Sequence, residues 1–373
     1  MSLAKHRLHA LCPYFAMFPH SFVREHVLAH TRPGDTVFDP FSGRGTTLLE
    51  SLLLDRYALA SDVNPVAACI TGAKAYVPPF DAIITRLCEL EVAFQETAIS
   101  PLDEERHSLP LFFARAFHYR TLREILFLRR RLDWRRDATD RFIAALALGS
   151  LHGEMDRSHS YFSNQMPRTI STKPDYSVRF WKERGLKAAR RPVFNILRNR
   201  AVFRLEQGSP SRFGIALQGD VRRATWMFGC HTRKVRAVIT SPPYLDVTNF
   251  EEDQWLRLWF LGGAPKPTYG QVSKDDRHSK PEIYWQFLAE AWQGIADLVA
   301  DEGVIVCRIG GKKQAPESLA RGMVATIRSA FPCAELVQGP LVSAPLLRQT
   351  DNFRPGTKGL AVEADFVFCV GKH

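Results

Sequence analysis

The chain has 373 residues, 45% of them hydrophobic, and its 50 Lys and Arg exceed its 39 Asp and Glu to give a net charge of +11. This length can hold a large α/β core and a second module. No apolar run approaches the ~20 residues that span a bilayer, and residues 1–11 lack the apolar core of a signal peptide. Seven scattered cysteines form no Cys-x-x-Cys pair and no Cys/His cluster at zinc spacing. We therefore expect a cytoplasmic protein with free thiols, no membrane segment and no metal site.

The first predicted elements are a helix, a strand and a glycine turn. Residues 20–30 have the pattern of an amphipathic helix, and residues 36–39 that of a short buried strand. The turn that follows carries Gly43 and Gly45, which let the backbone pass close to a ligand and adopt positive φ. A second helix follows, and Thr46 or Thr47 is its expected cap.

A second strand is predicted at residues 57–61, and Asp62 follows it directly. An acidic residue at this position of a nucleotide-binding α/β unit is placed to accept hydrogen bonds from ribose hydroxyls. The dinucleotide fingerprint Gly-x-Gly-x-x-Gly is absent, because Leu48 stands at its third glycine position. The turn and Asp62 together indicate a nucleotide-like ligand without that fingerprint.

Residues 80–211 interrupt the alternation of strands and helices, and their first part has apolar residues at helical spacing. Between Phe112 and Arg212 the chain has 22 basic and 9 acidic residues, a net charge of +13, which leaves the remainder near −2. Arginine dominates the excess, and a localised basic region is typical of nucleic-acid binding. We expect a mainly helical DNA-recognition module here. The alternative is a helical cap on the sheet edge whose charges are simply solvated.

A loop that mixes polar and aromatic residues is predicted at residues 159–169. Asn and Gln can read adenine, Arg can read guanine, and aromatic side chains can stack or wedge. The predicted DNA contacts in and after this loop are Asn164, Gln165, Arg168, Lys173, Arg190 and Arg191.

Strands and helices alternate again after the insertion. Further strands are predicted at residues 213–217, 235–239, 303–308, near 334–341 and at 364–370, with helices at 281–300 and 316–330. This alternation predicts an α/β fold with a doubly wound, mainly parallel sheet.

The strand at residues 235–239 leads into Thr240-Ser241-Pro242-Pro243-Tyr244. The exocyclic amino group of cytosine or adenine is a poor nucleophile, because its lone pair is shared with the ring. The Ser241 hydroxyl and the carbonyl of Ser241 or Pro242 can accept hydrogen bonds from such an amino group. The two prolines would hold these acceptors rigid, and Tyr244 offers a face on which a flipped base can stack. A strand followed by a Pro-Pro turn and a packing tyrosine is the alternative.

These motifs together resemble the DNA amino-methyltransferases, which use S-adenosyl-L-methionine to make N4-methylcytosine or N6-methyladenine. Residues 41–45 match the cofactor turn of that family and residues 241–244 its catalytic motif, and the resemblance covers about residues 10–80 and 212–373. Arg44 departs from a commonly small residue, and Phe250 stands where an aromatic hydroxyl is often found.

The resemblance implies a Rossmann-like methyltransferase sheet with an antiparallel last strand. Residues 1–79 and 212–373 would form the catalytic domain, with residues 80–211 inserted as the recognition module. Serine before Pro-Pro-Tyr favours cytosine N4 in this family, so the expected reaction is methyl transfer to cytosine N4 in duplex DNA.

Site residues are implied by the same resemblance. The turn and Asp39 would hold the methionine end of the cofactor, Asp62 its ribose, and Asp220 its adenine. The full set of implied cofactor residues is Phe18, Asp39, Pro40, Phe41, Gly43, Gly45, Thr46, Asp62, Val63, Asp220 and Val221. The implied catalytic residues are Ser241, Pro242, Pro243 and Tyr244, which act by base flipping and direct transfer with no metal and no cysteine nucleophile.

Three other functions stay open. They are an adenine-N6 methyltransferase, an RNA guanine-N2 methyltransferase and a catalytically silent DNA-binding subunit. The expected partner is double-stranded DNA, and a cognate restriction endonuclease that cuts the same site is possible.

Overall fold

The chain is divided between two units, and each unit is assembled from three separate segments. A computed structural model describes residues 5–14, 19–155, 159–165, 173–245, 250–271, 280–311, 315–343 and 362–371. Unit 1 consists of Met1–Pro13, Val77–Ser209 and Asn249–Gln271, and unit 2 of Tyr14–Tyr76, Pro210–Thr248 and Val272–His373.

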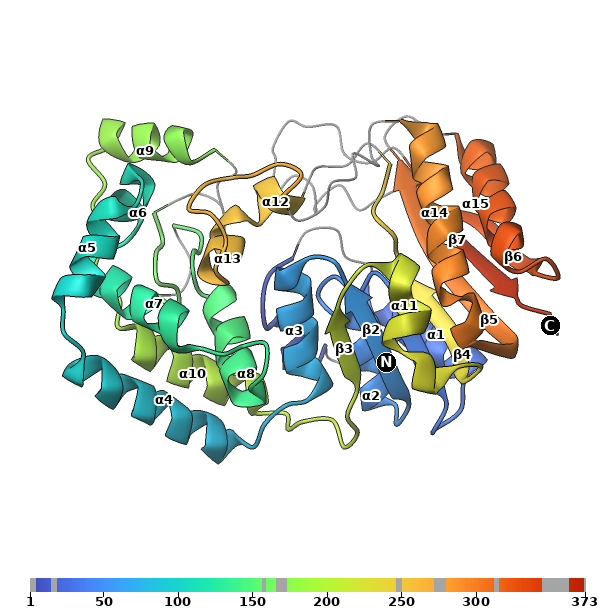
Figure 1. Cartoon of the computed structure of the whole chain (residues 1–373), viewed down its shortest axis with the longest axis horizontal. Helices are drawn as coiled ribbons and strands as arrows, with labels where there is room; N and C mark the ends of the chain where they lie inside the picture. The colour runs from blue at the N-terminus through green and yellow to red at the C-terminus, as the bar shows by residue number, and fades with distance from the viewer. Residues whose placement is uncertain are drawn as a thin grey trace. The chain divides into compact units, whose positions relative to one another are not determined.

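Unit 2 is built on a seven-stranded sheet in the order β3-β2-β1-β4-β5-β7-β6 (Figure 1). Its strands are β1 (Thr36–Asp39), β2 (Tyr57–Asp62), β3 (Ile215–Gln218), β4 (Val235–Thr240), β5 (Val299–Gly311), β6 (Glu335–Ser343) and β7 (Val362–Cys369). Strands β1 to β5 pair in parallel, whereas β7 runs antiparallel to both β5 and β6. The predicted α/β fold is confirmed, and the last strand is antiparallel as the resemblance implies.

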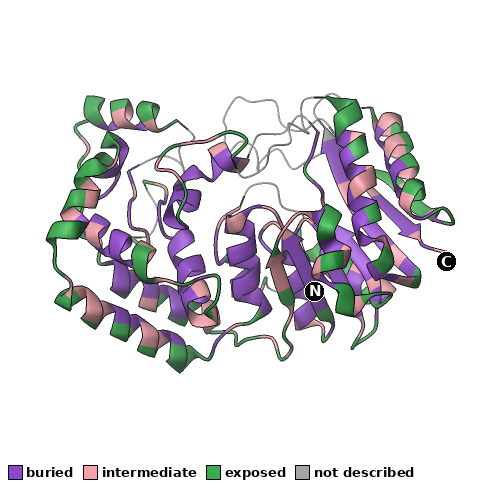
Figure 2. Ribbon diagram, viewed as in Figure 1, coloured by how far each residue is buried: buried purple, intermediate pink, exposed green. Residues whose placement is uncertain are grey.

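Alternating side chains along the strands give the sheet two apolar faces. Phe38 and Val238 point to the face covered by α11 (Ala224–Met227), α14 (Pro281–Ile295) and α15 (Pro316–Ala330). Val37, Ala237 and Ile239 point to the opposite face, where they pack against α1 (His20–His30). The same face carries α2 (Thr46–Leu53) and α3 (Pro65–Ala75), whose apolar residues pack over β2. In Figure 2 the central strands are accordingly buried along most of their length. This burial on both sides explains why β1, β2 and β4 are short and largely apolar runs.

The helix predicted at residues 281–300 is shorter than expected. It ends at Ile295, and a 3-10 turn over Ala296–Leu298 leads directly into β5. Val299 pairs with Val235 at the start of β4, so strand pairing decides the conformation of a segment whose own sequence is compatible with helix.

Unit 1 is mainly helical in its described residues. Its helices are a 3-10 helix over Arg7–Ala10, α4 (Phe80–Glu96), α5 (Ser100–Ser108), α6 (Leu111–Ala116), α7 (Tyr119–Arg131), α8 (Ala138–Leu148), α9 (Pro174–Glu183), α10 (Val193–Leu205), α12 (Phe250–Asp253) and α13 (Trp255–Phe260). Among the described residues of the whole chain, no helix combines the length and the apolar character needed to cross a membrane.

The boundaries of unit 1 differ from the predicted insertion at residues 80–211. Trp259 packs against Phe113 with ring centroids 4.4 Å apart, and Trp255 packs against Phe112 at 4.9 Å. The N-terminal segment joins the same unit, because the Arg7 backbone N–H donates to Gln207 Oε1 at 2.6 Å. Residues 1–13 and 249–271, expected in the catalytic domain, therefore belong with the helical unit.

Candidate active site

The candidate active site lies at the carboxyl ends of β1, β2 and β4 in unit 2. Strand β1 has β2 on one side and β4 on the other, so the strand order reverses there. Ligands of doubly wound sheets bind outside the carboxyl ends of the strands at such a point. Thr240 Oγ1 donates to Asp39 Oδ1 at 2.6 Å, which joins the last residues of β4 and β1 across the reversal. The turn after β1 and the motif after β4 therefore start from directly adjacent positions.

The turn after β1 has the backbone that its glycines predict. Gly43 has φ +50° and Gly45 φ +74°, both in the left-handed region. A Cβ on Gly45 would lie 2.8 Å from Thr71 Oγ1, so helix α3 closes off that side of the turn. Gly45 is itself the residue before α2, with no side-chain cap, while Thr46 is buried inside the helix. The prediction that Thr46 or Thr47 caps this helix is therefore wrong.

Asp39 is a buried carboxyl group, with 1% of its surface exposed. Besides the Thr240 hydroxyl it accepts a hydrogen bond from the Phe41 backbone N–H at 3.1 Å. Burial raises its pKa to about 7, and the hydrogen bonds oppose this only in part. The ionised form of Asp39 is thus costly by itself, and a nearby positive charge would relieve that cost.

Asp62 ties the end of β2 to the glycine turn. Its Oδ2 accepts from the Gly43 N–H and its Oδ1 from the Asn64 N–H, both at 2.9 Å. Burial raises its pKa to about 6. A carboxylate has about four acceptor positions, so these two bonds still leave lone pairs for a ribose hydroxyl.

Several residues that the sequence analysis did not select support the turn. The Asn64 side-chain amide donates to the Tyr14 hydroxyl at 3.0 Å, and the Tyr14 ring lies 3.5 Å from the position of a Cβ on Gly43. The fully buried Lys74 donates to the Arg44 carbonyl at 2.5 Å. Burial lowers the pKa of the Arg44 guanidinium to about 10. A lysine in an otherwise apolar helix was the one local signal for these contacts.

The remaining predicted cofactor residues have mixed surroundings. Asp220 is engaged by Arg222, whose Nη2 lies 2.6 Å from Asp220 Oδ2, and Val221 is part of the apolar core. An adenine at this position would compete with Arg222 for the carboxylate.

Two other predicted cofactor residues use their carbonyls within the protein. Pro40 is buried and its carbonyl accepts from Ser61 Oγ at 3.3 Å, while the Val63 carbonyl accepts from Gln218 at 3.4 Å. Phe18 lies outside the described residues.

The motif after β4 alternates between buried and accessible residues. Ser241 is half-buried, Pro242 buried and Pro243 exposed. Tyr244 has only 8% of its surface exposed, and its hydroxyl donates to Glu363 Oε1 at 3.3 Å. Burial raises the pKa of this hydroxyl well above its ordinary value. A base can stack on the Tyr244 ring only after the groups that cover it move.

The predicted DNA contacts lie in unit 1, where they differ in accessibility. Gln165 is buried, and its side-chain amide donates to the Ala116 carbonyl at 3.3 Å. The Asn164 amide donates to the Glu154 carbonyl at 2.9 Å. Lys173 and Arg190 are exposed, and Arg191 is half-buried. Arg168 lies outside the described residues.

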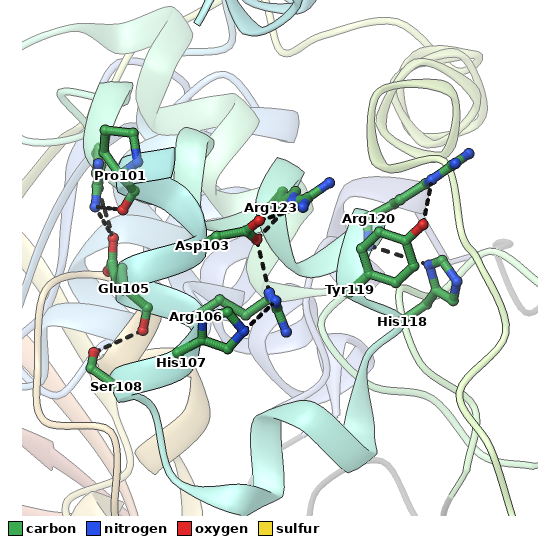
Figure 3. Close-up of polar contacts among 11 residues, drawn as sticks. Pro101, Asp103, Glu105, Arg106, His107, Ser108, His118, Tyr119, Arg120 and Arg123 are labelled. Atoms are coloured by element: carbon green, nitrogen blue, oxygen red, sulfur yellow. Dashed lines mark hydrogen bonds and ion pairs between the residues drawn. The ribbon is translucent and has the colours of Figure 1, made fainter. Parts of the chain in front are cut away.

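Much of the arginine in unit 1 is paired with acidic side chains (Figure 3). Arg123 binds both carboxylate oxygens of Asp103, which Arg106 also contacts at 3.0 Å, and Arg130 Nε donates to Glu105 at 2.7 Å. Residues 80–211 contain 23 basic and 16 acidic residues, a net charge of +7. The acidic helices at the start of the insertion therefore neutralise part of the basic excess that follows.

The chain is similar to known DNA methyltransferases over short stretches. The family of DNA methylases of the N6/N4 type matches residues 2–71. The Type II methyltransferase M.SmaI of Serratia marcescens is 45% identical over 61 residues, which are 16% of this chain and 21% of that protein. The Type II methyltransferase M.Cfr9I of Citrobacter freundii is 42% identical over 52 residues, 14% of this chain and 17% of that protein. The matched stretch thus spans less than a quarter of the length of either relative.

The solved structures to which this chain is similar include the rRNA methyltransferase aviRa of Streptomyces viridochromogenes. The identity is 13% and the TM-score 0.36, over 98% of this chain and 92% of that one. Within the described residues, no group of three or more His, Cys, Asp or Glu side chains is placed to hold a metal ion.

Proposed function

We propose that the chain is a DNA methyltransferase that transfers a methyl group from S-adenosyl-L-methionine to an exocyclic amino group, and the similarity of residues 2–71 to the DNA methylase family supports this. One observation carries the proposal. The hydrogen bond between Thr240 and Asp39 joins the turn at Gly43 and Gly45 to the Ser-Pro-Pro-Tyr segment at the strand-order reversal of the sheet.

The charge of the site suits this cofactor, which supplies an electrophilic methyl group on a positively charged sulfur. Asp39 and Asp62 sit at the ends of adjacent strands, and burial raises the pKa of both. Two such carboxyl groups are costly to ionise alone, and a cationic ligand would stabilise their ionised forms. Asp39 and the turn would hold the methionine moiety, and Asp62 the ribose. Asp220 and the neighbouring Val63 and Val221 would hold the adenine, with Arg222 giving way.

The Ser-Pro-Pro-Tyr segment would prepare the target amine. The Ser241 hydroxyl and the Pro242 carbonyl accept hydrogen bonds from the two amino N–H groups, which draws the nitrogen lone pair out of conjugation with the ring. Pro243 stiffens the segment. Tyr244 then stacks on the flipped base, and the chain contributes mainly by positioning.

Cytosine N4 is the proposed target atom, and adenine N6 the second candidate. The serine before Pro-Pro-Tyr supports cytosine, through the resemblance alone. The proposed substrate is duplex DNA in the cytoplasm, where a cognate restriction endonuclease would cut the unmethylated site. Of the predicted DNA contacts, Lys173 and Arg190 are exposed, and they would meet phosphate.

One experiment identifies the methylated base and the methylated atom together. The chain is expressed in a host that lacks DNA methylation, and the genomic DNA is hydrolysed and analysed by mass spectrometry for N4-methylcytosine and N6-methyladenine. The Ser241→Ala variant, expressed in parallel, is the control. N4-methylcytosine that depends on Ser241 supports the proposal, and N6-methyladenine would replace the target atom. If purified protein transfers labelled methyl to RNA alone, or to no nucleic acid, the proposed function is wrong.

A further inference from the structure

We propose that Glu363, in the antiparallel strand β7, is a positioning residue that fixes the ring of Tyr244 for the base. The inference rests on the proposed function, because it concerns how the residue expected to stack on the base is held. Its basis is a set of contacts inside unit 2 that the sequence motifs do not include.

The first contact is between Tyr244 and Glu363. The Tyr244 hydroxyl donates to Glu363 Oε1 at 3.3 Å, and both side chains are largely enclosed, with 8% of Tyr244 and 20% of the Glu363 side chain exposed. In such surroundings water competes poorly for the tyrosine hydroxyl. Its direction is therefore set by the protein groups that contact it, which are the Glu363 carboxylate and the Ser241 side chain.

The second contact holds Glu363 itself. Arg308 of β5 binds Asp365 in a bidentate pair, with Nε 2.6 Å from Oδ1 and Nη2 2.7 Å from Oδ2. These two residues stand directly opposite each other in the β5–β7 ladder. The remaining terminal nitrogen of Arg308, Nη1, lies 3.9 Å from Glu363 Oε2. One oxygen of Glu363 therefore faces the arginine, and the other faces Tyr244.

A third contact fixes the arginine. The Arg308 guanidinium lies over the ring of Phe22, 4.2 Å from its centroid, and only 11% of the Arg308 side chain is exposed. The planar fork is thus held by a ring on its face and a carboxylate along its edge. Rotation of Arg308 away from Glu363 would therefore break both the contact with Phe22 and the pair with Asp365.

This network restricts the side-chain torsion angles of Tyr244, which the two prolines do not restrict. Pro242 and Pro243 restrict their own φ angles, but they do not set χ1 and χ2 of Tyr244. Glu363 fixes the far end of the side chain while the backbone fixes the near end. The plane of the ring is then set before the base arrives, which saves the entropy of ordering it in the transition state.

The test uses the full-length protein and four variants: Tyr244→Phe, Glu363→Ala, Glu363→Gln and the double variant Tyr244→Phe/Glu363→Ala. Single-turnover methylation, cofactor affinity and melting temperature are measured for each. Glu335→Ala, which removes an exposed carboxylate from the neighbouring strand β6, is the matched control. If Glu363→Ala is unfolded at the assay temperature, Glu363→Leu takes its place.

We expect Glu363→Ala to lower the single-turnover rate about tenfold, the effect of one hydrogen bond of ordinary net strength, and Tyr244→Phe to lower it at least as much. The double variant should be no slower than Tyr244→Phe alone, because the loss of the hydroxyl already removes the interaction with Glu363. Glu363→Gln keeps an acceptor oxygen and should stay within about threefold of the wild type. Cofactor affinity should be unchanged in all. Rate losses that multiply in the double variant, or a glutamine variant as slow as the alanine one, would overturn the inference.

A second readout does not depend on methylation. Tetranitromethane nitrates accessible tyrosines, and peptide mapping reports the rate at Tyr244. The structure predicts protection in the wild type and in Glu363→Gln, and faster nitration in Glu363→Ala. Equal rates in all three would contradict the positioning role even if the protein proved inactive on DNA, so the two proposals can fail separately.

Discussion

Gly45→Ala should destabilise unit 2 by two separable effects. Gly45 has φ +74°, a region that costs an L-residue about 1–2 kcal/mol. The new Cβ would also lie 2.8 Å from Thr71 Oγ1, 3.0 Å from Cγ2 and 3.2 Å from Cα. The Cα belongs to the backbone of α3 and cannot rotate away, so overpacking adds roughly 1–3 kcal/mol.

Gly34→Ala separates the two effects. Gly34 lies in the same unit with φ +89°, and no atom comes within 4 Å of the position of its Cβ. It should therefore carry the backbone cost alone. Melting followed by circular dichroism should place Gly45→Ala below Gly34→Ala by roughly 2–4 °C for each kcal/mol of clash. Cofactor affinity should fall in Gly45→Ala and not in Gly34→Ala. Equal melting temperatures for the two variants would show that α3 does not close off the turn as described.

Three further outcomes are expected. The pKa of Asp39 is about 7 in the fold against an ordinary 3.8, so its contribution to stability is full below about pH 4 and lost as the pH rises through 7. Asp39→Asn should consequently have a higher free energy of unfolding than the wild type at pH 8, by up to about 4 kcal/mol, and no higher one at pH 4. It should also bind the cationic cofactor more weakly. Ser241→Ala should lower turnover about 10–100-fold with cofactor affinity retained, whereas Asp62→Ala should chiefly weaken cofactor binding. If each variant lost turnover and cofactor affinity equally, the assigned roles would be contradicted. Arg190→Glu with Arg191→Glu should weaken DNA binding and reduce the slope of log affinity against log salt by about 1 per phosphate contact, and an unchanged slope would remove these residues from the interface.

The central strands could be predicted from local sequence because β1, β2 and β4 are short, largely apolar runs. Strand β5 extends over Val299–Gly311, beyond the residues 303–308 that the sequence predicts. The strand at residues 36–39 was predicted with its observed bounds, and the helices at 20–30 and 316–330 likewise. Residues 296–300 could not be assigned in this way, because the pairing of Val299 with Val235 of β4 is a long-range contact. The cap of α2 was misassigned since Thr46 and Thr47 suit a cap, whereas the left-handed Gly45 occupies that position.

Candidate site residues could be proposed from sequence where they lie in one motif, whereas contacts that form only in space could not. Asp39 and Asp62 end the strands β1 and β2, and Ser241 follows β4 directly, which marks all three as carboxyl-end residues. Arg308 and Glu363 come from strands whose pairing cannot be read locally. The sequence does hold one sign of this arrangement: Glu363 and Asp365 are two residues apart in a strand, and so lie on the same face of the sheet. The burial of Gln165 was equally invisible, because a polar loop gives no sign of which amides turn inward.

The division of each unit into three segments bears on how the protein is synthesised. Trp255 and Trp259 complete the aromatic core begun by Phe112 and Phe113. At about 5–20 residues per second, several seconds or more pass between the synthesis of the two phenylalanines and that of the two tryptophans. During this interval the nascent helices expose large aromatic surfaces, and the parallel sheet still lacks its final strands. Neither unit can be cut out as one continuous piece, and unit 1 is complete only after residue 271 has been synthesised.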